Sequence, residues 1–184
     1  MRIITGTLKG RRLKAPDWPG LRPTSDKLRE TLFNVLGTRV AGASFVDGYA
    51  GTGAVGIEAL SRGAAFVTFV EDDRRAADLI AANLRHCGVE ERYAIIRVDF
   101  ARARLEPGRT PAGIIFLDPP YGAAQMPRAL DAASAMAGDD TVVVVEHAKR
   151  DAPPERRGRL ALTRDLTSGD SGLAFYGVQD LARP

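Results

Sequence analysis

The residues best suited to chemistry are Asp118-Pro119-Pro120-Tyr121, which follow the apolar segment 113–117. Two prolines would end a strand there and fix the backbone, which leaves carbonyls without neighbouring amide donors. The Asp118 carboxylate and the Pro119 carbonyl could then accept the two hydrogens of an exocyclic amine on a nucleobase. Tyr121 could stack on that base, a contact worth roughly 1–3 kcal/mol. Taken alone, the same segment is also compatible with a strand end followed by a turn.

A glycine-rich loop forms the second candidate site and has the sequence Asp47-Gly48-Tyr49-Ala50-Gly51-Thr52-Gly53-Ala54-Val55-Gly56. Its glycines at positions 51, 53 and 56 complete a G-x-G-x-x-G motif, and Glu71 lies 20 residues after Gly51. This pattern is typical of a dinucleotide site, in which the pyrophosphate binds the N-terminus of a helix. Glycines at a strand-to-helix turn can also serve tight packing alone.

The acidic residues around this loop favour a different cofactor. Asp47, Glu71, Asp99 and Asp118 are expected at the ends of four parallel strands, all facing one rim. A pyrophosphate there would meet like charge, at a cost of about 4 kcal/mol for one pair about 4 Å apart at an effective dielectric constant of about 20. S-adenosyl-L-methionine carries a sulfonium and an ammonium and has no phosphate. We expect Asp47 near its amino-acid end, Glu71 at its ribose hydroxyls and Asp99 near its adenine amine.

The full set of predicted cofactor contacts combines the glycine loop with the acidic strand ends. Its members are Asp47, Tyr49, Ala50, Gly51, Thr52, Gly53, Glu71, Asp72, Asp99, Phe100 and Asp118. Helix capping is the alternative role for Asp72, Asp73 and Asp99. No metal site is predicted, because Cys87, His86 and His147 do not form a Cys/His cluster with the spacing of a zinc site.

Positive charge is concentrated in residues 1–29. This segment holds eight Lys or Arg residues against Asp17 and Asp26, a net charge of +6, whereas the whole chain carries +3 and the remainder therefore −3. A basic segment on a mildly acidic body is expected of a protein that binds nucleic-acid phosphates, although a solvated basic surface would have the same composition. The residues predicted to bind RNA are Arg2, Lys9, Arg11, Arg12, Lys14, Arg22, Thr24, Lys27 and Arg29.

These motifs need a scaffold, and the apolar pattern predicts one in which strands and helices alternate. Strands are predicted at residues 44–47, 65–70, 94–98, 113–117 and 141–145, with helices at 54–62, 74–87 and 127–137 between them. Two further strands, 160–163 and 173–178, follow without a helix between them. The fold class is therefore α/β, a doubly wound Rossmann-like sheet whose last strand is antiparallel. Ligands of such sheets bind at the carboxyl ends of the strands.

The N-terminal region is predicted as a small basic extension of this sheet. Residues 3–4 and 13 indicate a short β-hairpin, and an amphipathic helix between Asp26 and Gly37 would bridge it to the body. We therefore predict two units, a basic hairpin with its bridging helix at residues 1–37 and a cofactor-binding domain at residues 38–184.

The composition excludes several classes of protein. A length of 184 residues with 45% hydrophobic content suits one domain with a small appendage. No apolar run approaches the roughly 20 residues of a membrane span, and the first residues lack the apolar stretch of a signal peptide. We expect a cytoplasmic protein that does not bind membranes and is a monomer.

The motifs together resemble a known class of enzymes. The glycine loop, the acidic residue after it and Asp118 to Tyr121 are similar to class I S-adenosyl-L-methionine-dependent methyltransferases that modify amino groups of bases. Further stretches point to one family: MRII at residues 1–4, KGRRL at 9–13, RPTSDKLRETLFN at 22–34 and EALSRG at 58–63. With these stretches, the chain resembles the RsmD family over nearly its whole length.

Members of the RsmD family methylate N2 of one guanine in the 16S rRNA of the small ribosomal subunit. The resemblance implies S-adenosyl-L-methionine as cofactor, and 16S rRNA or the assembling small subunit as partner. It also implies that residues 38–184 are the methyltransferase domain and that Asp118 to Tyr121 are catalytic. Thr5, Gly48 and Thr52 depart from the family's usual residues without removing a proposed contact.

Other functions stay open on the sequence alone. An adenine-N6 methyltransferase on DNA or RNA is the nearest alternative, because Asp118 to Tyr121 do not select the base. An NAD-dependent oxidoreductase and a non-catalytic RNA-binding assembly factor are further alternatives. Residues 148–170 match no motif, and we interpret their basic cluster, Arg156, Arg157 and Arg159, as solvated.

Overall fold

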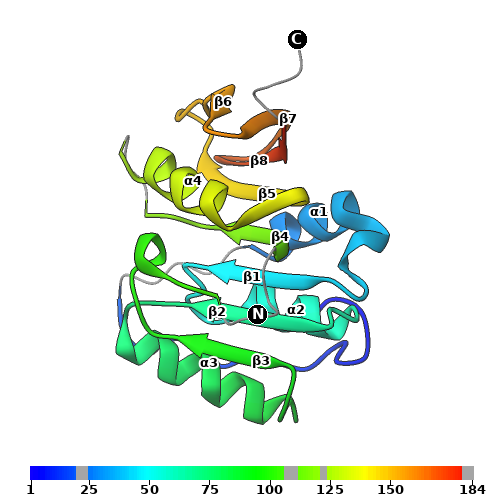
Figure 1. The fold of residues 1–184 in the computed structure, drawn as a ribbon. Coiled ribbons are helices and arrows are strands. Elements are labelled where there is room, and N and C mark those ends of the chain that lie inside the picture. The colour runs from blue at the N-terminus through cyan, green and yellow to red at the C-terminus, as the bar shows by residue number, and fades with distance from the viewer. Residues whose placement is uncertain (20–24, 106–111, 121–123, 180–184) are drawn as a thin grey trace.

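One eight-stranded sheet forms the centre of the computed structural model, which describes residues 1–19, 25–105, 112–120 and 124–179 (Figure 1). The strands lie in the order β3-β2-β1-β4-β5-β8-β7-β6. Their bounds are Ser44–Gly48 for β1, Phe66–Val70 for β2, Tyr93–Ile96 for β3, Ala112–Leu117 for β4, Ala137–Ala148 for β5, Arg156–Arg157 for β6, Leu160–Ser168 for β7 and Ser171–Val178 for β8. The helices are α1 (Asp26–Leu36), α2 (Ala54–Ser61), α3 (Arg74–His86) and α4 (Gln125–Met136), with short 3-10 helices η1 (Gly37–Val40) and η2 (Phe100–Arg102).

The pairing of the strands confirms the predicted fold class. Strands β3, β2, β1, β4 and β5 pair with one another in parallel, in this order. Strand β8 pairs antiparallel with β5. Strand β8 lies between β5 and β7, so the last strand in sequence is inside the sheet and not at its edge. The carboxyl ends of β1, β2, β4 and β5 share one edge of the sheet, which we call the rim.

Helices bury both faces of the parallel strands, as the near-continuous apolar sequence of these strands requires. Phe45 of β1 belongs to a core that includes side chains of α1, α2 and α3. The next residue, Val46, belongs to a second core with side chains of α4 and η2. This alternation decides which face each side chain of the site occupies.

Strand β6 was not predicted, and β5 and β7 differ most from the predicted boundaries. Strand β5 begins at Ala137, directly after α4, and is 12 residues long, whereas the sequence indicated a strand only at 141–145. Strand β7 continues past residue 163 to Ser168 through exposed residues such as Arg164 and Asp165. Those residues carry no apolar alternation, but their backbones still pair with β8.

The basic cluster in the C-terminal region is engaged in contacts with other side chains. Arg157 pairs with Asp131 of α4 through two hydrogen bonds of 2.6 and 2.7 Å. Arg159 pairs with Asp139 at 2.6 Å, and Arg156 donates to Gln179 at 2.8 Å. All three arginines stay partly exposed, so their interpretation as solvated stays a prediction.

The N-terminal hairpin is reduced to a single bridge between Arg2 and Arg12. Two backbone bonds of 2.9 Å, from the Ile3 amide to the Arg11 carbonyl and from the Gly10 amide to the Ile3 carbonyl, hold it. Ile3 and Leu13 are buried in the core that also contains α1 and α2. The N-terminal segment therefore packs on the body, and its definition as a separate unit at residues 1–37 stays a prediction.

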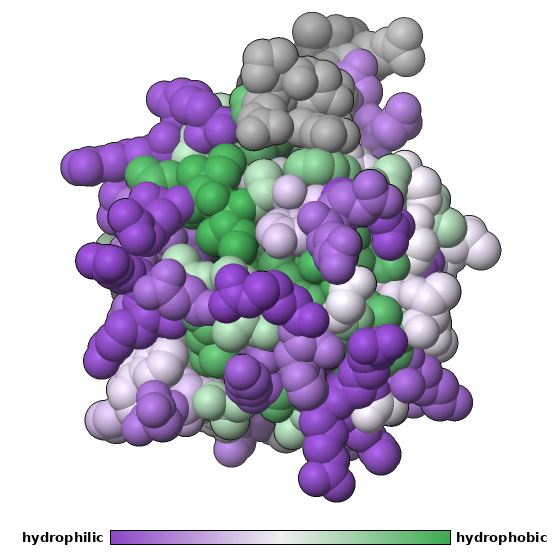
Figure 2. All heavy atoms as spheres, turned by 90° about the horizontal axis from the view of Figure 1, so that it is seen from below, coloured by the Kyte–Doolittle hydropathy of each residue, from purple (hydrophilic) through white to green (hydrophobic). Residues whose placement is uncertain are grey.

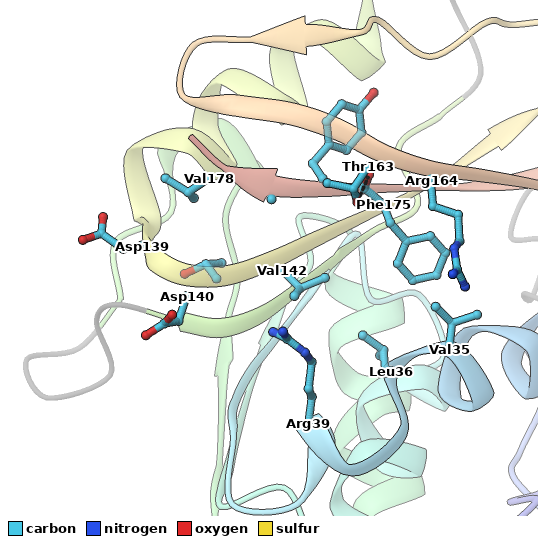
Figure 3. Close-up of a pocket in the computed structure, with 13 residues that line it drawn as sticks. Val35, Leu36, Arg39, Asp139, Asp140, Val142, Thr163, Arg164, Phe175 and Val178 are labelled. Carbon is cyan, nitrogen blue, oxygen red and sulfur yellow. Dashed lines mark hydrogen bonds between the residues drawn. The ribbon is translucent and has the colours of Figure 1, made fainter. Parts of the chain in front are cut away.

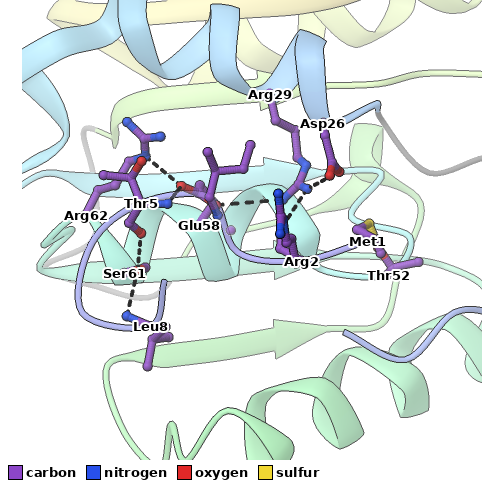
Figure 4. Close-up of polar contacts among 12 residues, drawn as sticks. Met1, Arg2, Thr5, Leu8, Asp26, Arg29, Thr52, Glu58, Ser61 and Arg62 are labelled. Atoms are coloured by element: carbon purple, nitrogen blue, oxygen red, sulfur yellow. Dashed lines mark hydrogen bonds and ion pairs between the residues drawn. The ribbon is translucent and has the colours of Figure 1, made fainter. Parts of the chain in front are cut away.

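A buried carboxylate on α2 fastens this segment (Figure 4). Glu58 is fully buried and accepts hydrogen bonds from the amides of Ile4 at 2.7 Å and Thr5 at 3.0 Å and from Arg62 Nε at 2.8 Å. Gly6 has φ +87°, and a Cβ there would collide with the carbonyl oxygen of Ser61. The backbone of the N-terminal segment can therefore approach the backbone of α2 at Ser61 only because residue 6 is glycine.

Arg29 lies in the same network, and the prediction that it binds RNA needs correction. Its side chain is completely buried, donates to the Arg2 carbonyl at 2.9 Å and to Asp26 at 2.6 Å, and lies 3.8 Å from Glu58. A guanidinium that is out of contact with solvent cannot meet a phosphate on the surface. Arg29 instead links α1 to the N-terminal segment.

Candidate active site at the rim of the sheet

The glycine loop joins β1 to α2 at the rim. Gly51 and Gly53 have φ of +56° and +76°, a left-handed conformation that favours glycine. Tyr49 adopts the same conformation at φ +61° and packs its ring 5.5 Å from that of Phe100. The third glycine, Gly56, lies in α2, where a Cβ would collide with the ring of Phe69. The motif therefore serves both a tight turn and the close packing of α2 on the sheet.

Asp47 lies beneath this loop and does not face the rim. Its carboxylate is 1% exposed and accepts a 2.8 Å hydrogen bond from the Gly56 amide. The side chain shares the face of Phe45, two residues earlier in β1, and is therefore directed toward α2. Burial raises the pKa of Asp47 from 3.8 to about 8, with the Gly56 hydrogen bond opposing and the charge of Glu71 adding to the shift. Asp47 is thus protonated at neutral pH and does not contribute charge against a phosphate.

This pKa predicts how stability depends on pH. The carboxyl of Asp47 ionises near pH 3.8 in the unfolded chain but near pH 8 in the folded protein. Between these values the folded state holds the extra proton, so the free energy of unfolding falls as pH rises, by at most about 1.4 kcal/mol per pH unit.

Asp47→Asn removes this dependence, because the amide oxygen still accepts from Gly56 but does not ionise. Urea unfolding measures the free energy of unfolding at pH 6 and at pH 8. Between these two values, we expect the free energy of unfolding of the wild type to fall by roughly 2–3 kcal/mol more than that of Asp47→Asn. Equal changes for the two proteins would show that Asp47 is ionised in the folded state.

Glu71 fixes the glycine loop from the next strand. It follows β2, is 8% exposed, and accepts from the Gly51 amide at 2.8 Å and the Asp73 amide at 3.0 Å. Burial raises its pKa, and these two hydrogen bonds lower it. Asp73 caps α3 by accepting from the Arg75 amide at 2.7 Å, whereas Asp72 is exposed. The capping alternative therefore holds for Asp73, and Glu71 and Asp72 remain at the rim.

Asp99 lies at the rim beyond β3, and it also caps a helix. Its carboxylate accepts from the Ala101 amide of η2 at 2.8 Å. Arg128 of α4 forms an ion pair with it at 3.2 Å. Burial raises the pKa of Tyr49 to about 12, with Asp99 adding to the shift and Arg128 opposing it, so the three polar groups form one cluster. The sequence held no signal for Arg128, which lies in a helix without a motif.

Asp118, Pro119 and Pro120 follow β4 directly and adjoin the glycine loop. Gly48 pairs with Leu117, and the Asp118 amide approaches the Gly48 carbonyl at 3.4 Å. Asp118 is half-buried, Pro119 is buried and Pro120 is exposed. The structure thus brings the glycine loop, Glu71, Asp99 and Asp118 to one rim, while Tyr121 lies outside the described residues.

Most of the predicted RNA-binding side chains are exposed. They are Arg2, Lys9, Arg11, Arg12, Lys14 and Lys27. Arg22 and Thr24 lie outside the described residues. Asn83, which the sequence analysis did not single out, ties this segment to the site. Its side chain accepts from the Lys14 amide at 2.8 Å and donates to the Thr52 carbonyl at 2.9 Å. A polar residue on the apolar face of α3, beside Ile80 and Leu84, was the available signal.

A groove of about 440 Å³ lies away from the rim (Figure 3). Residues of α1, η1, β5, β7 and β8 line it, among them Arg39, Asp140, Arg164 and Phe175. Asp140 belongs to the first residues of β5, at the edge of the sheet opposite the carboxyl ends of the parallel strands. The groove therefore shares no residue with the candidate active site.

The described residues hold neither a membrane-spanning helix nor a cluster of metal ligands. No helix there has the length and apolar character required to cross a membrane. Nor do three or more His, Cys, Asp or Glu side chains gather in that part of the chain as ligands for a metal ion.

The chain is similar to known proteins over most of its length. The model of the family described as conserved hypothetical protein 95 matches residues 1–177. Ribosomal RNA small subunit methyltransferase D of Escherichia coli K12 is 34% identical over 178 residues, which cover 96% of this chain and 89% of the relative. The Haemophilus influenzae protein of the same name is 40% identical over 126 residues, covering 66% and 64% of the two chains.

Solved structures show the same similarity. The chain superposes on YhhF of Escherichia coli with a TM-score of 0.83 and 32% identity, covering 97% and 98% of the two chains. It superposes on a hypothetical protein of Thermus thermophilus with a TM-score of 0.78 and 28% identity, covering 97% and 99%. A family model that spans nearly the whole chain and relatives above 30% identity establish that the chain belongs to the RsmD family, described as conserved hypothetical protein 95.

Proposed function

We propose that this protein transfers a methyl group from S-adenosyl-L-methionine to the exocyclic N2 amine of a guanine in 16S rRNA. A coarser function, S-adenosyl-L-methionine-dependent methylation of rRNA, follows from the family, whose relatives are named rRNA small subunit methyltransferases. The position of Asp118 and Pro119 beside the glycine loop, through the pairing of β1 with β4, supports transfer to an exocyclic amine of a base. The choice of N2 of guanine rests on the resemblance to the RsmD family.

The residues at the rim fit S-adenosyl-L-methionine better than a dinucleotide. Glu71 would accept from the ribose hydroxyls, and Asp99 from the adenine amine. The left-handed glycines at 51 and 53 allow the backbone to approach the cofactor closely. The Asp99 carboxylate can accept a further hydrogen bond beside its ion pair with Arg128, because a carboxylate has about four acceptor positions. The bound cofactor would supply an activated methyl group.

Asp118 and Pro119 would prepare the amine for this methyl group. The amine nitrogen is a poor nucleophile, because its lone pair is delocalised into the base. Two rigid acceptors that hold its hydrogens would favour rehybridisation of the amine nitrogen and direct its lone pair toward the methyl group of the cofactor. The contribution of the protein is orientation and electrostatic complementarity, which can lower barriers by several kcal/mol. The target base must be unpaired or flipped out of its helix to reach this position.

The proposal is tested by identifying the product. Labelled S-adenosyl-L-methionine is incubated with the protein and either under-methylated small ribosomal subunits or naked 16S rRNA, and the nucleosides are analysed by mass spectrometry. N2-methylguanosine at one mapped position is the expected product. N6-methyladenosine would assign the protein to the adenine-N6 alternative, and RNA binding without any transfer would indicate a non-catalytic assembly factor.

A further inference from the structure

We propose that α3 and residues 11–18 of the N-terminal segment together form one RNA-binding surface that runs along the helix toward the rim. The inference rests on the proposed function and deepens it, because it adds Arg85 and His86 of α3 to the residues that meet the substrate. It also gives the RNA strand a path to the candidate active site. Its partner is the phosphate backbone of a single strand, with one base near Trp18.

Contacts at three points place the segment along α3. Arg11 Nη1 lies 3.7 Å from the position that a Cβ on Gly88 would occupy, just beyond the C-terminal end of the helix. In the last turn of the helix, the Lys14 amide donates to Asn83 at 2.8 Å. At the N-terminal end, the guanidinium of Arg75 lies 5.1 Å from the centroid of the Trp18 ring. The segment therefore runs antiparallel to α3, whose 13 residues span about 20 Å.

The C-terminal end of this surface gathers exposed basic side chains. Its members are Arg11, Arg12, Lys14, Arg85 and His86. None of these five side chains forms an ion pair with another described residue. Arg157 and Arg159, at the other end of the sheet, are each paired with an aspartate. Unpaired exposed cations are free to neutralise phosphates, and the release of counterions then drives binding.

Arg85 and His86 also have a purely structural explanation, since cations in the last turn stabilise the helix dipole. That explanation does not account for the position of Arg11, which belongs to a different segment and brings further positive charge to the same helix end. Burial raises the pKa of the Cys87 thiol there, and the charge of Arg11 opposes the shift. Figure 2 views the molecule from the side of α3 and β3 and shows hydrophilic side chains spread over this face.

The opposite end of the surface reaches the rim through Trp18. Arg75 is held under the indole by Asp73 at 3.0 Å, and Asp73 donates its backbone amide to Glu71. Glu71 in turn holds the glycine loop. The indole is partly exposed and lies against Arg75, and an exposed aromatic ring is typical of a platform on which an unpaired base stacks. A strand that runs from the basic C-terminal end of α3 along the helix to Trp18 thus arrives beside the candidate active site.

Charge reversal at Arg85 tests this surface, with Arg156→Glu as the matched control. Arg156 is an exposed arginine on β6, at the opposite edge of the sheet from β3. Binding of purified 16S rRNA is measured by filter binding across a range of salt concentrations. Arg85→Glu is expected to weaken binding about tenfold and to flatten the salt dependence by about one unit of slope, while Arg156→Glu binds as the wild type does. Equal affinities for the two variants would overturn the proposal.

Trp18 supplies a second readout because it is the sole tryptophan of the chain. Its fluorescence is expected to be quenched when RNA binds to the wild type, and to titrate with weaker affinity in Arg85→Glu. Unchanged emission at saturating RNA would show that the strand does not reach the rim end of α3. Binding of S-adenosylhomocysteine to Arg85→Glu at wild-type affinity controls for correct folding.

The two proposals fail in different ways. If the wild type methylates small subunits but Arg85→Glu binds RNA normally, the surface on α3 is refuted and the proposed reaction stands. If the wild type transfers no methyl group while Arg85→Glu still loses RNA affinity, the surface stands and the proposed reaction is refuted.

Discussion

Replacing Asp118 with alanine is expected to abolish methyl transfer while binding of S-adenosylhomocysteine persists within a few-fold of the wild type. The carboxylate follows β4 at the rim and would orient the amine. Loss of one preorganised electrostatic group of this kind lowers turnover by about 10²–10³-fold. The glycine loop and Glu71 keep their mutual hydrogen bond in the variant, so the cofactor should still bind. Single-turnover transfer of labelled methyl groups and calorimetric titration measure the two properties separately.

Two further variants sharpen this prediction. Asp118→Asn keeps one oxygen that can accept from the amine and is expected to retain more activity than alanine. Asp140→Ala removes an exposed carboxylate at the opposite edge of the sheet and should leave transfer unchanged. Full activity of Asp118→Ala would exclude the proposed role of this residue.

Glu58→Ala is expected to be the most destabilising single substitution in the network that fastens the N-terminal segment. The variant deprives the Ile4 and Thr5 amides and the Arg62 side chain of their acceptor. It also leaves the fully buried Arg29 without one of its two carboxylate neighbours. Breaking a buried charge pair by removing one partner costs about 3–5 kcal/mol. Urea denaturation should show this loss in the free energy of unfolding.

The matched control is Asp131→Ala, which removes an ion pair of comparable geometry at the surface. Asp131 and Arg157 are about half exposed, with side-chain exposures of 51% and 45%. Exposed pairs contribute about 0–1 kcal/mol, so this variant should unfold close to the wild type. A loss for Glu58→Ala no larger than that for Asp131→Ala would show that the buried network does not stabilise the fold.

The parallel half of the sheet was predictable from the sequence because its strands are short apolar runs bounded by glycine and acidic residues. The antiparallel half was less predictable. Residues 164–168 of β7 are mostly exposed and polar, and they are strand only because the β8 backbone pairs with them. Backbone pairing with a distant segment leaves no periodic trace in the sequence of such a strand.

In the candidate site, too, some features were predictable from the sequence and others were not. The clustering of Glu71, Asp99 and Asp118 followed from the parallel topology, whereas the direction of Asp47 depended on which face of β1 it occupies. That direction was available in principle, because Asp47 lies two residues after Phe45 and therefore shares its face of the sheet, opposite to that of Val46. Arg29 likewise falls on the apolar stripe of α1 beside Leu28 and Phe33, and that position indicates a buried side chain instead of an exposed cation. The Asp99–Arg128 pair joins elements far apart in sequence and had no local signal.

The central position of β8 has a consequence for how the chain is made. On the ribosome, the edge of β5 that β8 covers in the folded sheet stays without its native partner until residues 171–178 have emerged from the exit tunnel. Synthesis proceeds at about 5–20 residues per second, so this unpaired backbone edge stays open for a period of seconds. During that time it can pair with strands of other chains. Truncation before residue 171 therefore removes the inner partner of β5 and not a dispensable tail, and such fragments should aggregate during synthesis.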